Sequence, residues 1–334
     1  MKKILLIIGA GSSKAIDPAF PLGVELAHAI DHHLITTKKK TNPPKKIKVH
    51  YLSSMINELN NVFKSTYNYD PLRLDPLLDS FKRKLWDYVQ AYFYNDMRMD
   101  TPPISIDQLV SKINGRNKTQ ITDIAKFSIV YYLKGVESAF FDKFKADKEI
   151  LTATWVYHFF EKLKPQYDSL EQILQCLHVR TFNYERLFEF CSKQSLSRLY
   201  NLPLRETNAL KLNITPVYGN IGSLTQYPFK LENNKVPKLK KAHKSIKLIG
   251  EERESCSNFN ICDYETVLFI GFGYNIENIE KALGIKKGNL KECHGMCYQP
   301  KDKSLVAIDR KYNIRIKHTQ CIQSFIDDHI TNCA

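Results

Sequence analysis

The chain has 334 residues, of which 43% are hydrophobic and 25% are charged, and this composition is ordinary for a soluble globular protein with a large core. No apolar stretch approaches the ~18 residues of a membrane-spanning helix, which excludes an integral membrane protein of that kind. Lys and Arg number 49 against 35 Asp and Glu, and the net charge of +14 favours an anionic partner such as nucleic acid.

Much of the positive charge lies in two lysine-rich stretches, residues 37–48 and 235–247. No zinc-finger, RRM or helix-turn-helix pattern accompanies them. Solvated loops are therefore the simpler interpretation, and a surface for nucleic acid or another anionic ligand is the alternative.

The eight cysteines are spread through the chain rather than packed into a small secreted domain, so we expect reduced thiols and a cytoplasmic protein. Cys256 with Cys262 and Cys293 with Cys297 have C-x₅-C and C-x₃-C spacings. A structural zinc site with four cysteine ligands typically uses two C-x₂-C pairs within one small module. We therefore expect no metal site.

The N-terminal stretch KKILLIIGAGSS fits either a secretory signal peptide or a buried strand followed by a glycine turn. A signal peptide needs an apolar core of about 7–15 residues and a small-residue cleavage site. The apolar run from Ile4 to Ile8 is shorter, and Lys14 and Asp17 follow it. A continuous apolar run without polar alternation is typical of a strand buried on both faces of a parallel sheet, and we predict such a strand here.

Residues 23–34 carry apolar side chains at helical spacing, so strand, glycine turn and helix form the start of a βα unit. From about residue 50 to 175 the chain is rich in aromatic side chains spaced by three and four, which predicts several helices. We interpret residues 36–172, approximately, as a helical insertion within a single domain that spans residues 1–334.

Strand patterns return after Ile173. The stretch ILQCLHVRTFNYERLFEF predicts a strand, a turn over residues 181–183 and a helix from about Tyr184, and short strands are predicted within NITPVYGNIGSL and KSIKLIG. DYETVLFIGFGYNIENIEKAL predicts a buried strand over residues 266–270, a Gly-Phe-Gly turn and a helix. Two strand, G-x-G, helix units predict an α/β fold, a Rossmann-like parallel sheet with a large helical insertion.

The first glycine turn suits a nucleotide ligand. Glycine permits the tight turn, and backbone N–H groups at the start of the next helix can hold a pyrophosphate. The full G-x-G-x-x-G fingerprint fails at Lys14, which argues against an ordinary NAD(P)-dependent dehydrogenase. A sharp turn without a ligand is the structural alternative.

In chain order, GAGSSKAIDPAFPLGVEL, SIDQLV, RTFNYERLFE, PVYGNIGSL and LFIGFGYNIENI together resemble the SIR2-like family, in particular its prokaryotic antiviral branch. The resemblance covers roughly residues 1–35 and 100–290, and the region between residues 35 and 175 matches only in length and texture. It implies NAD⁺ binding and, in the antiviral branch, hydrolysis of the nicotinamide glycosidic bond, which depletes NAD⁺ during infection.

The resemblance also implies roles for individual residues. Asn183 would lie at the nicotinamide ribose and position the attacking water, although a turn or cap role is an equal alternative from the sequence alone. The first glycine turn would hold the pyrophosphate. The Gly-Phe-Gly turn at residues 271–273, called the late turn below, would lie beneath the adenosine half of NAD⁺. The implied cofactor-binding residues are Gly9, Ala10, Gly11, Ser12, Gly271, Gly273, Asn275 and Asn278.

The chemistry is consistent with a neutral amide at this position. Cleavage builds oxocarbenium character on the ribose, and nicotinamide is already a good leaving group. The protein therefore needs orientation, a dry pocket and an oriented polar group more than a strong acid.

One position departs from the family, because the family has a histidine base where this chain has Tyr218. Tyrosine, with an unperturbed pKa of about 10, is a poor general base near neutral pH. Three alternatives follow. In the first, hydrolysis proceeds at a site that includes Tyr218, with weaker assistance from a base. In the second, Glu185, His178 or His243 replaces the histidine as the base. In the third, catalysis is lost, and the chain is a non-catalytic module that binds NAD⁺ or ADP-ribose and acts through a partner.

The resemblance implies a setting as well as a reaction. It predicts a cytoplasmic NAD⁺ hydrolase in anti-phage defence, with NAD⁺ as substrate. Unregulated NAD⁺ loss is toxic, so we expect restraint through a homo-oligomer or an ATPase partner of the HerA-like type. The lysine-rich stretches leave nucleic acid as a further partner, and no membrane partner is expected.

Overall fold

The computed structural model describes residues 2–35, 118–230, 242–248, 260–288, 291–297, 303–319 and 321–330, together with the single positions 76, 79, 80, 83, 105, 106, 110 and 251. These residues group into two compact units. Unit 1 comprises residues 1–20, 140–217 and 253–334, and unit 2 comprises residues 21–139 and 218–252.

Unit 1 is built on a sheet of six parallel strands in the order β3-β2-β1-β4-β5-β6. The strands are β1 Ile4–Ile8, β2 Leu177–Thr181, β3 Asn213–Pro216, β4 Thr266–Ile270, β5 Cys293–Cys297 and β6 Ile314–His318. This is the strand order of α/β folds that bind dinucleotides. The predicted α/β class with a Rossmann-like parallel sheet is confirmed.

Strand β1 lies at the centre of the sheet, and all five of its residues are buried. Its last residue, Ile8, is in register with Thr181 at the end of β2 and with Ile270 at the end of β4. Three parallel strands therefore end at the same level. The turns that follow them meet at one edge of the sheet, which positions the site described below.

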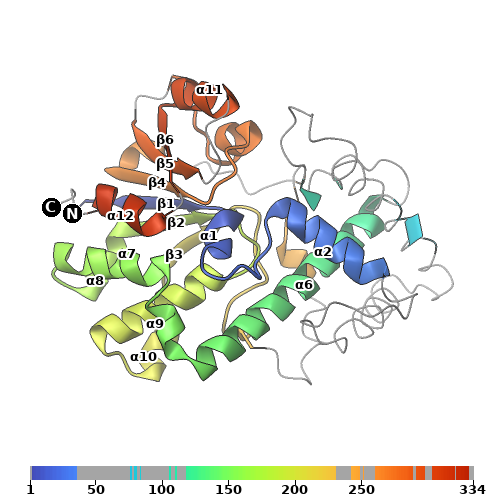
Figure 1. Ribbon diagram of the computed structural model, residues 1–334, viewed down its shortest axis with the longest axis horizontal. Coiled ribbons are helices and arrows are strands. Elements are labelled where there is room, and N and C mark those ends of the chain that lie inside the picture. The colour runs from blue at the N-terminus through green and yellow to red at the C-terminus, as the bar shows by residue number, and fades with distance from the viewer. Residues whose placement is uncertain are drawn as a thin grey trace. The chain divides into compact units, whose positions relative to one another are not determined.

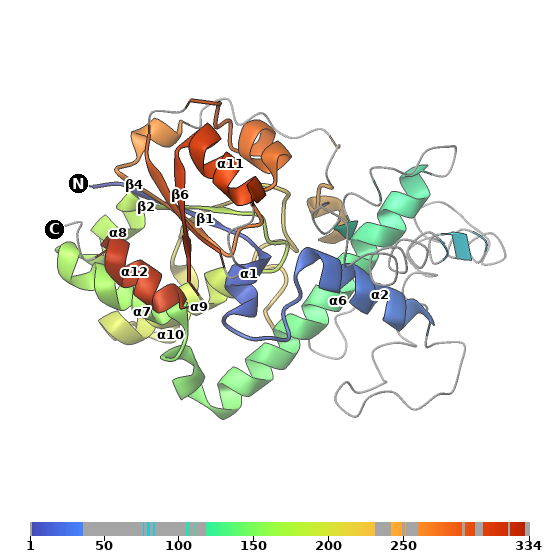
Figure 2. The same ribbon diagram turned by 45° about the horizontal axis from the view of Figure 1, so that its top comes forward.

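Helices cover both faces of this sheet, with α11 on one face and α7, α9 and α12 on the other (Figures 1 and 2). The longer helices of unit 1 are α7 Trp155–Leu163, α8 Leu170–Cys176, α9 Leu187–Tyr200, α11 Lys303–Tyr312 and α12 Ile322–Ile330. The short ones are α1 Ala10–Lys14, η1 Lys148–Leu151, η2 Lys164–Gln166, α10 Leu204–Ala209, η4 Ile261–Asp263 and the π-helical turn η5 Asn278–Ala282.

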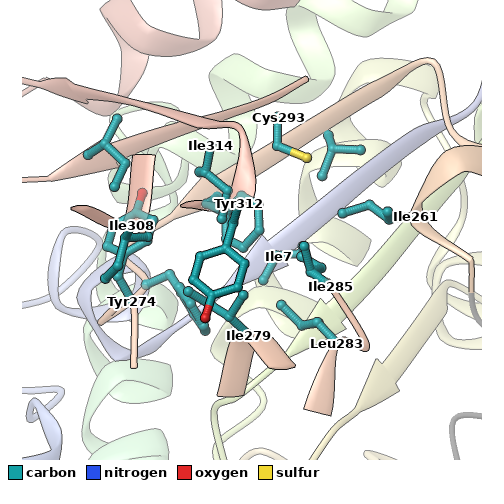
Figure 3. Packing of buried hydrophobic residues seen from close by; sticks show 14 of the residues in the cluster. Ile7, Ile261, Tyr274, Ile279, Leu283, Ile285, Cys293, Ile308, Tyr312 and Ile314 are labelled. Carbon is teal, nitrogen blue, oxygen red and sulfur yellow. The ribbon is translucent and has the colours of Figure 1, made fainter. Parts of the chain in front are cut away.

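Alternate residues of the central strands form the core beneath α11. Ile7 of β1, Cys293 of β5 and Ile314 of β6 pack with Ile308 and Tyr312 of α11 (Figure 3). The apolar area that these side chains remove from water is the main favourable contribution to folding. The same core holds η5 and the turn after β4 against the sheet.

Unit 2 contains α2 Gly23–Ile35 and residues 118–139 of the long helix α6 Lys118–Ala146. A fully buried ion pair lies on α6, where Lys134 Nζ is 2.9 Å from Glu137 Oε2. Lys134 also donates to the carbonyl oxygens of Pro228 at 2.5 Å and Phe229 at 2.7 Å. One ammonium group therefore ties the segment around residue 228 to α6.

Several predicted elements need correction. ILQC at residues 173–176 is the end of helix α8 rather than the start of a strand, because a side-chain cap at Ser169 begins a helix that runs directly into β2. KSIKLIG contributes a single antiparallel bridge between Ile246 and Gly219 instead of a strand. Strand β5 coincides with CHGMC, a stretch whose spacing of cysteines suggests a metal pair and predicts no strand.

Much of the predicted helical insertion, residues 36–172, falls outside the described residues. Of its described part, residues 118–139 belong to unit 2 and residues 140–172 to unit 1. Both lysine-rich stretches also lie largely outside the described residues. Among the helices that the structure describes, none is long and apolar enough to cross a bilayer.

Replacing Lys134 with Met should lower the free energy of unfolding by ~3–5 kcal/mol, because it removes the ammonium partner of the buried Glu137 carboxylate. Urea unfolding would measure the loss. The double variant Lys134→Met/Glu137→Leu should recover part of it, since no charge is then left behind. Equal losses in the single and double variants would contradict this account.

Candidate functional site

The turns after β1 and β4 pack backbone against backbone. Gly9 N–H donates to Ile270 O at 3.1 Å, and Gly11 N–H donates to Gly271 O at 3.0 Å. A Cβ atom on Gly9 would lie 2.6 Å from Gly271 O, and one on Gly271 would lie 2.0 Å from Ser12 N. Gly271 also has φ +60°, where L side chains are strained. Contact between the two turns therefore requires these glycines.

Hydrogen bonds across this contact and within the first turn use most of the N–H groups of that turn. Besides Gly9 and Gly11, Ser12 donates its N–H to Gly9 O at 2.9 Å and its hydroxyl to the same oxygen at 2.7 Å. The Ala10 N–H has no acceptor among the described residues. A pyrophosphate at this turn would thus meet one open backbone donor of residues 9–12 rather than four.

The turn after β2 brings two polar side chains to α1. Ser13 Oγ donates to Glu185 Oε1 at 2.5 Å, and Asn183 Nδ2 donates to Ser13 Oγ at 3.0 Å and to Glu185 Oε1 at 2.9 Å. The Leu187 N–H, at the start of α9, donates to Glu185 Oε2 at 2.5 Å. We call Ser13, Asn183 and Glu185 the polar triad, and all three are buried.

Backbone hydrogen bonds fix this turn on the end of the sheet. Phe182 N–H donates to Ile8 O at 2.9 Å, and Asn183 N–H donates to Thr181 Oγ1 at 3.1 Å. Asn183 is therefore held directly beyond the central strand, which agrees with its predicted place in a polar turn. Its partner Glu185 belongs to the same turn and is a sequence-based candidate, whereas Ser13 comes from α1 and has no signal in the sequence.

The amide oxygen of Asn183 is a buried acceptor that the triad does not use. Its side chain is 6% exposed, and Oδ1 has no hydrogen-bond partner among the described residues. Buried polar atoms are nearly always hydrogen-bonded in native proteins, so such an atom indicates a water or a ligand that donates to it. Because Nδ2 donates to a carboxylate, the amide is polarised and Oδ1 becomes a stronger acceptor.

The late turn is anchored on its other side by Tyr274. This residue adopts φ +49°, and its hydroxyl donates to Met296 O of β5 at 2.9 Å. A Cβ atom on Gly295 would lie 2.2 Å from that hydroxyl, so the glycine in CHGMC makes room for the tyrosine. Burial raises the pKa of Tyr274 well above its ordinary value. It is therefore a neutral hydroxyl that anchors the turn.

The other predicted residues of the late turn differ in their surroundings. A Cβ atom on Gly273 would meet no atom within 4 Å, so packing does not require this glycine. Asn275 Oδ1 accepts the Glu277 N–H at 2.8 Å and caps the helical segment, and Asn278 begins η5. Contact of these residues with an adenosine stays a prediction.

Tyr218 is buried within unit 2, whereas the polar triad lies in unit 1. Its carbonyl oxygen accepts the Lys247 N–H at 2.7 Å. The next residue, Gly219, has φ +71°, and a Cβ atom there would lie 1.8 Å from Ser245 O. The predicted catalytic role of Tyr218 stays a prediction.

Of the three candidate replacements for the missing histidine, Glu185 is the one that contacts Asn183. His178 lies near the beginning of β2, in register with Leu5, at the end of the strand away from the turn. Burial lowers the pKa of His178. His243 belongs to unit 2, where its ring packs edge-to-face against Phe127 with centroids 6.3 Å apart.

The cysteines on β5 are part of the sheet. Cys293 is buried in the core beneath α11, and burial raises the pKa of its thiol to about 12. Cys256, half of the other pair, lies outside the described residues. Across the part of the chain that the structure describes, no group of three or more His, Cys, Asp or Glu side chains could hold a metal ion.

Comparison of the chain with protein-family models, with curated proteins and with solved structures gives no match. The class of protein is therefore defined by the fold and the site alone. It is an α/β protein with a parallel sheet in 3-2-1-4-5-6 order and a buried polar triad at the carboxyl edge of β1 and β2. In such sheets ligands bind outside the carboxyl ends of the strands where the strand order reverses, here between β1 and β4.

Gly271→Ala should destabilise the protein by at least about 2 kcal/mol, because it combines a left-handed backbone with a clash on Ser12 N. Gly273→Ala is the matched control, since its Cβ would meet open space. Thermal unfolding of both variants checks this. A Gly271→Ala midpoint equal to that of Gly273→Ala would show that the two turns do not depend on their backbone contact.

Proposed function

We propose that this chain binds NAD⁺ at the carboxyl edge of its sheet and hydrolyses the bond between nicotinamide and ribose, releasing nicotinamide and ADP-ribose. The observation that carries the proposal is the buried Asn183 amide. Its Nδ2 is held by Ser13 and Glu185, while its Oδ1 has no partner among the described residues. This acceptor suits the O–H group of a water or of a ribose hydroxyl.

The fold supports the same ligand class. The strand order is that of dinucleotide-binding sheets, and the two glycine turns meet at the point between β1 and β4 where such ligands lie. The resemblance to SIR2-like proteins adds NAD⁺ as the particular dinucleotide. The occupied N–H groups of the first turn leave Ala10 N–H as the backbone donor of residues 9–12 that is open to a phosphate.

In the proposed reaction, the oxygen of a water molecule forms a bond to C1′ of the ribose. The bond from C1′ to the pyridinium nitrogen breaks, its electron pair passes to the ring, and neutral nicotinamide leaves. Asn183 Oδ1 orients the water or the ribose. A proton from the water passes to Ser13 Oγ as the Ser13 proton passes to Glu185, along the hydrogen bond already present between them.

Glu185 thereby takes the part that the resemblance assigns to a histidine. Its carboxylate accepts hydrogen bonds from Ser13, Asn183 and the Leu187 N–H, which hold it in one orientation. A buried carboxylate near the ribose would also stabilise the positive charge that develops there. The reaction so written does not need Tyr218 as a base.

The biological setting of the proposal rests on the resemblance. We propose a cytoplasmic enzyme of anti-phage defence, restrained by self-assembly or by an ATPase partner of the HerA-like type. The second candidate is a non-catalytic module that binds NAD⁺ or ADP-ribose, and the tyrosine at position 218 favours it. A nucleic-acid partner would use the lysine-rich stretches.

The test is nicotinamide release from NAD⁺ by the purified full chain, alone and with nucleic acid or a co-purified ATPase partner. Asn183→Ala and Glu185→Gln should each lower the rate at least ~100-fold, since each removes a group that acts in the transition state. Asn208→Ala is the matched control, because this asparagine is exposed on α10, and its rate should be unchanged.

Three results would each decide against hydrolysis by the native site. Full activity in Asn183→Ala would place the chemistry elsewhere. No nicotinamide release under any condition, together with a higher unfolding temperature in NAD⁺ or ADP-ribose, would identify the binding module. Activity that appears only in Tyr218→His would show that the native chain does not hydrolyse NAD⁺ because it lacks the family histidine.

A further inference from the structure

Trp155, the first residue of α7, contacts both segments that carry the polar triad. Its side chain is 2% exposed, and Nε1 donates to Ser12 O at 2.9 Å. Its ring stacks on that of Phe188, with centroids 5.6 Å apart and an interplanar angle of 25°. The indole therefore joins the turn after β1 to the first turn of α9.

The two contacts reach the triad by different routes, one through a peptide bond and one through a backbone hydrogen bond. Ser12 O belongs to the peptide group that precedes Ser13, so the indole N–H fixes the plane from which the Ser13 side chain extends. Phe188 follows Leu187, whose N–H donates to Glu185 Oε2. Trp155 thus contacts the segments that carry Ser13 and Glu185, the two groups to which Asn183 Nδ2 donates.

We propose that Trp155 is a positioning residue for Asn183, and that its indole N–H, acting through the Ser12 carbonyl and Ser13, fixes the direction of the Asn183 amide. The proposal rests on the proposed function for its kinetic consequence. If Trp155 only filled space, its effect would depend on the packed area of its ring. If Trp155 is a positioning residue, its effect depends on the indole N–H donor, so the two roles respond to different substitutions.

Two variants at this one position separate the roles. Trp155→Phe keeps an aromatic ring against Phe188 and removes the N–H donor. Trp155→His keeps a five-membered ring in which the Nε2–H group, like the indole Nε1–H group, is two bonds from Cγ. It removes the benzene ring that stacks on Phe188. Measurements at pH 8 keep the imidazole neutral, given its unperturbed pKa of about 6.5.

The kinetic test measures kcat and KM for NAD⁺. Trp155→Phe should lower kcat about tenfold, the effect of one lost hydrogen bond, with KM changed less than about twofold, because the group acts on the reacting end of the ligand. Trp155→His should keep kcat within about threefold of the native value while losing more thermal stability. Native kcat in Trp155→Phe, or an equal fall in both variants, would overturn the proposal.

A second measurement needs no activity and distinguishes failure of this proposal from failure of the proposed function. The side-chain amide signals of Asn183 can be assigned in an NMR spectrum by their loss in Asn183→Ala. Their exchange with solvent should be faster in Trp155→Phe and unchanged in Trp155→His. Unchanged exchange in Trp155→Phe would overturn the positioning role even if the native protein hydrolyses no NAD⁺.

If Trp155→Phe does not fold, Phe188→Leu takes its place, because it removes the stacked ring and leaves the donor intact. The Asn183 amide signals should then match those of the native protein. Faster exchange in Phe188→Leu would show that packing, rather than the indole N–H, holds the amide.

Discussion

The site depends on the close backbone contact between the turns after β1 and β4. Because Gly9 and Gly271 carry no Cβ atom, the two turns can approach until their peptide groups hydrogen-bond directly, and no Cβ atom would fit at either position. This contact fixes the direction in which the chain leaves β1 and so the start of α1. Helix α1 in turn carries Ser13, whose hydroxyl forms hydrogen bonds with Glu185 and Asn183.

This contact gives the glycine pattern a different meaning from the usual one. In a dinucleotide fingerprint, glycine is expected where the backbone approaches a pyrophosphate. Here Gly9 and Gly11 approach another segment of the protein, and their N–H groups are used there. Recognition of a nucleotide would fall more heavily on side chains, above all on the triad, and less on a cradle of backbone donors.

The sequence was informative where one physical cause dominates a short segment. Strand β1 and strand β4 are predictable because each contains a continuous apolar run, the whole of β1 and residues 267–270 of β4, and the turn at Asn183 is predictable from its polar residues. Strand β5 was not predictable, since CHGMC contains a polar His and a glycine that is required by Tyr274, a residue from another segment. The start of β2 is not marked in the sequence, because helix α8 runs into the strand without a break and ends in the same apolar pattern.

The candidate site was predictable in part for the same reason. Asn183 and the glycines stand in recognisable local patterns, and the contact of Asn183 with Glu185 joins residues of one turn. The contacts of Ser13 with these two residues, and of Trp155 with Ser12, join chain segments far apart in sequence. No local pattern encodes such pairings. They follow from the strand order, which brings the ends of β1, β2 and β4 together.

The central place of β1 also has a consequence for synthesis of the chain. Its neighbours are β2 and β4, and β4 ends only at Ile270. While the ribosome is still making the residues between β2 and β4, a fully apolar strand has a partner on one side and an open edge on the other. Open apolar edges pair readily with other chains. The segment that forms the centre of the folded sheet is therefore also an open apolar edge in the unfinished protein, where it can pair with other chains.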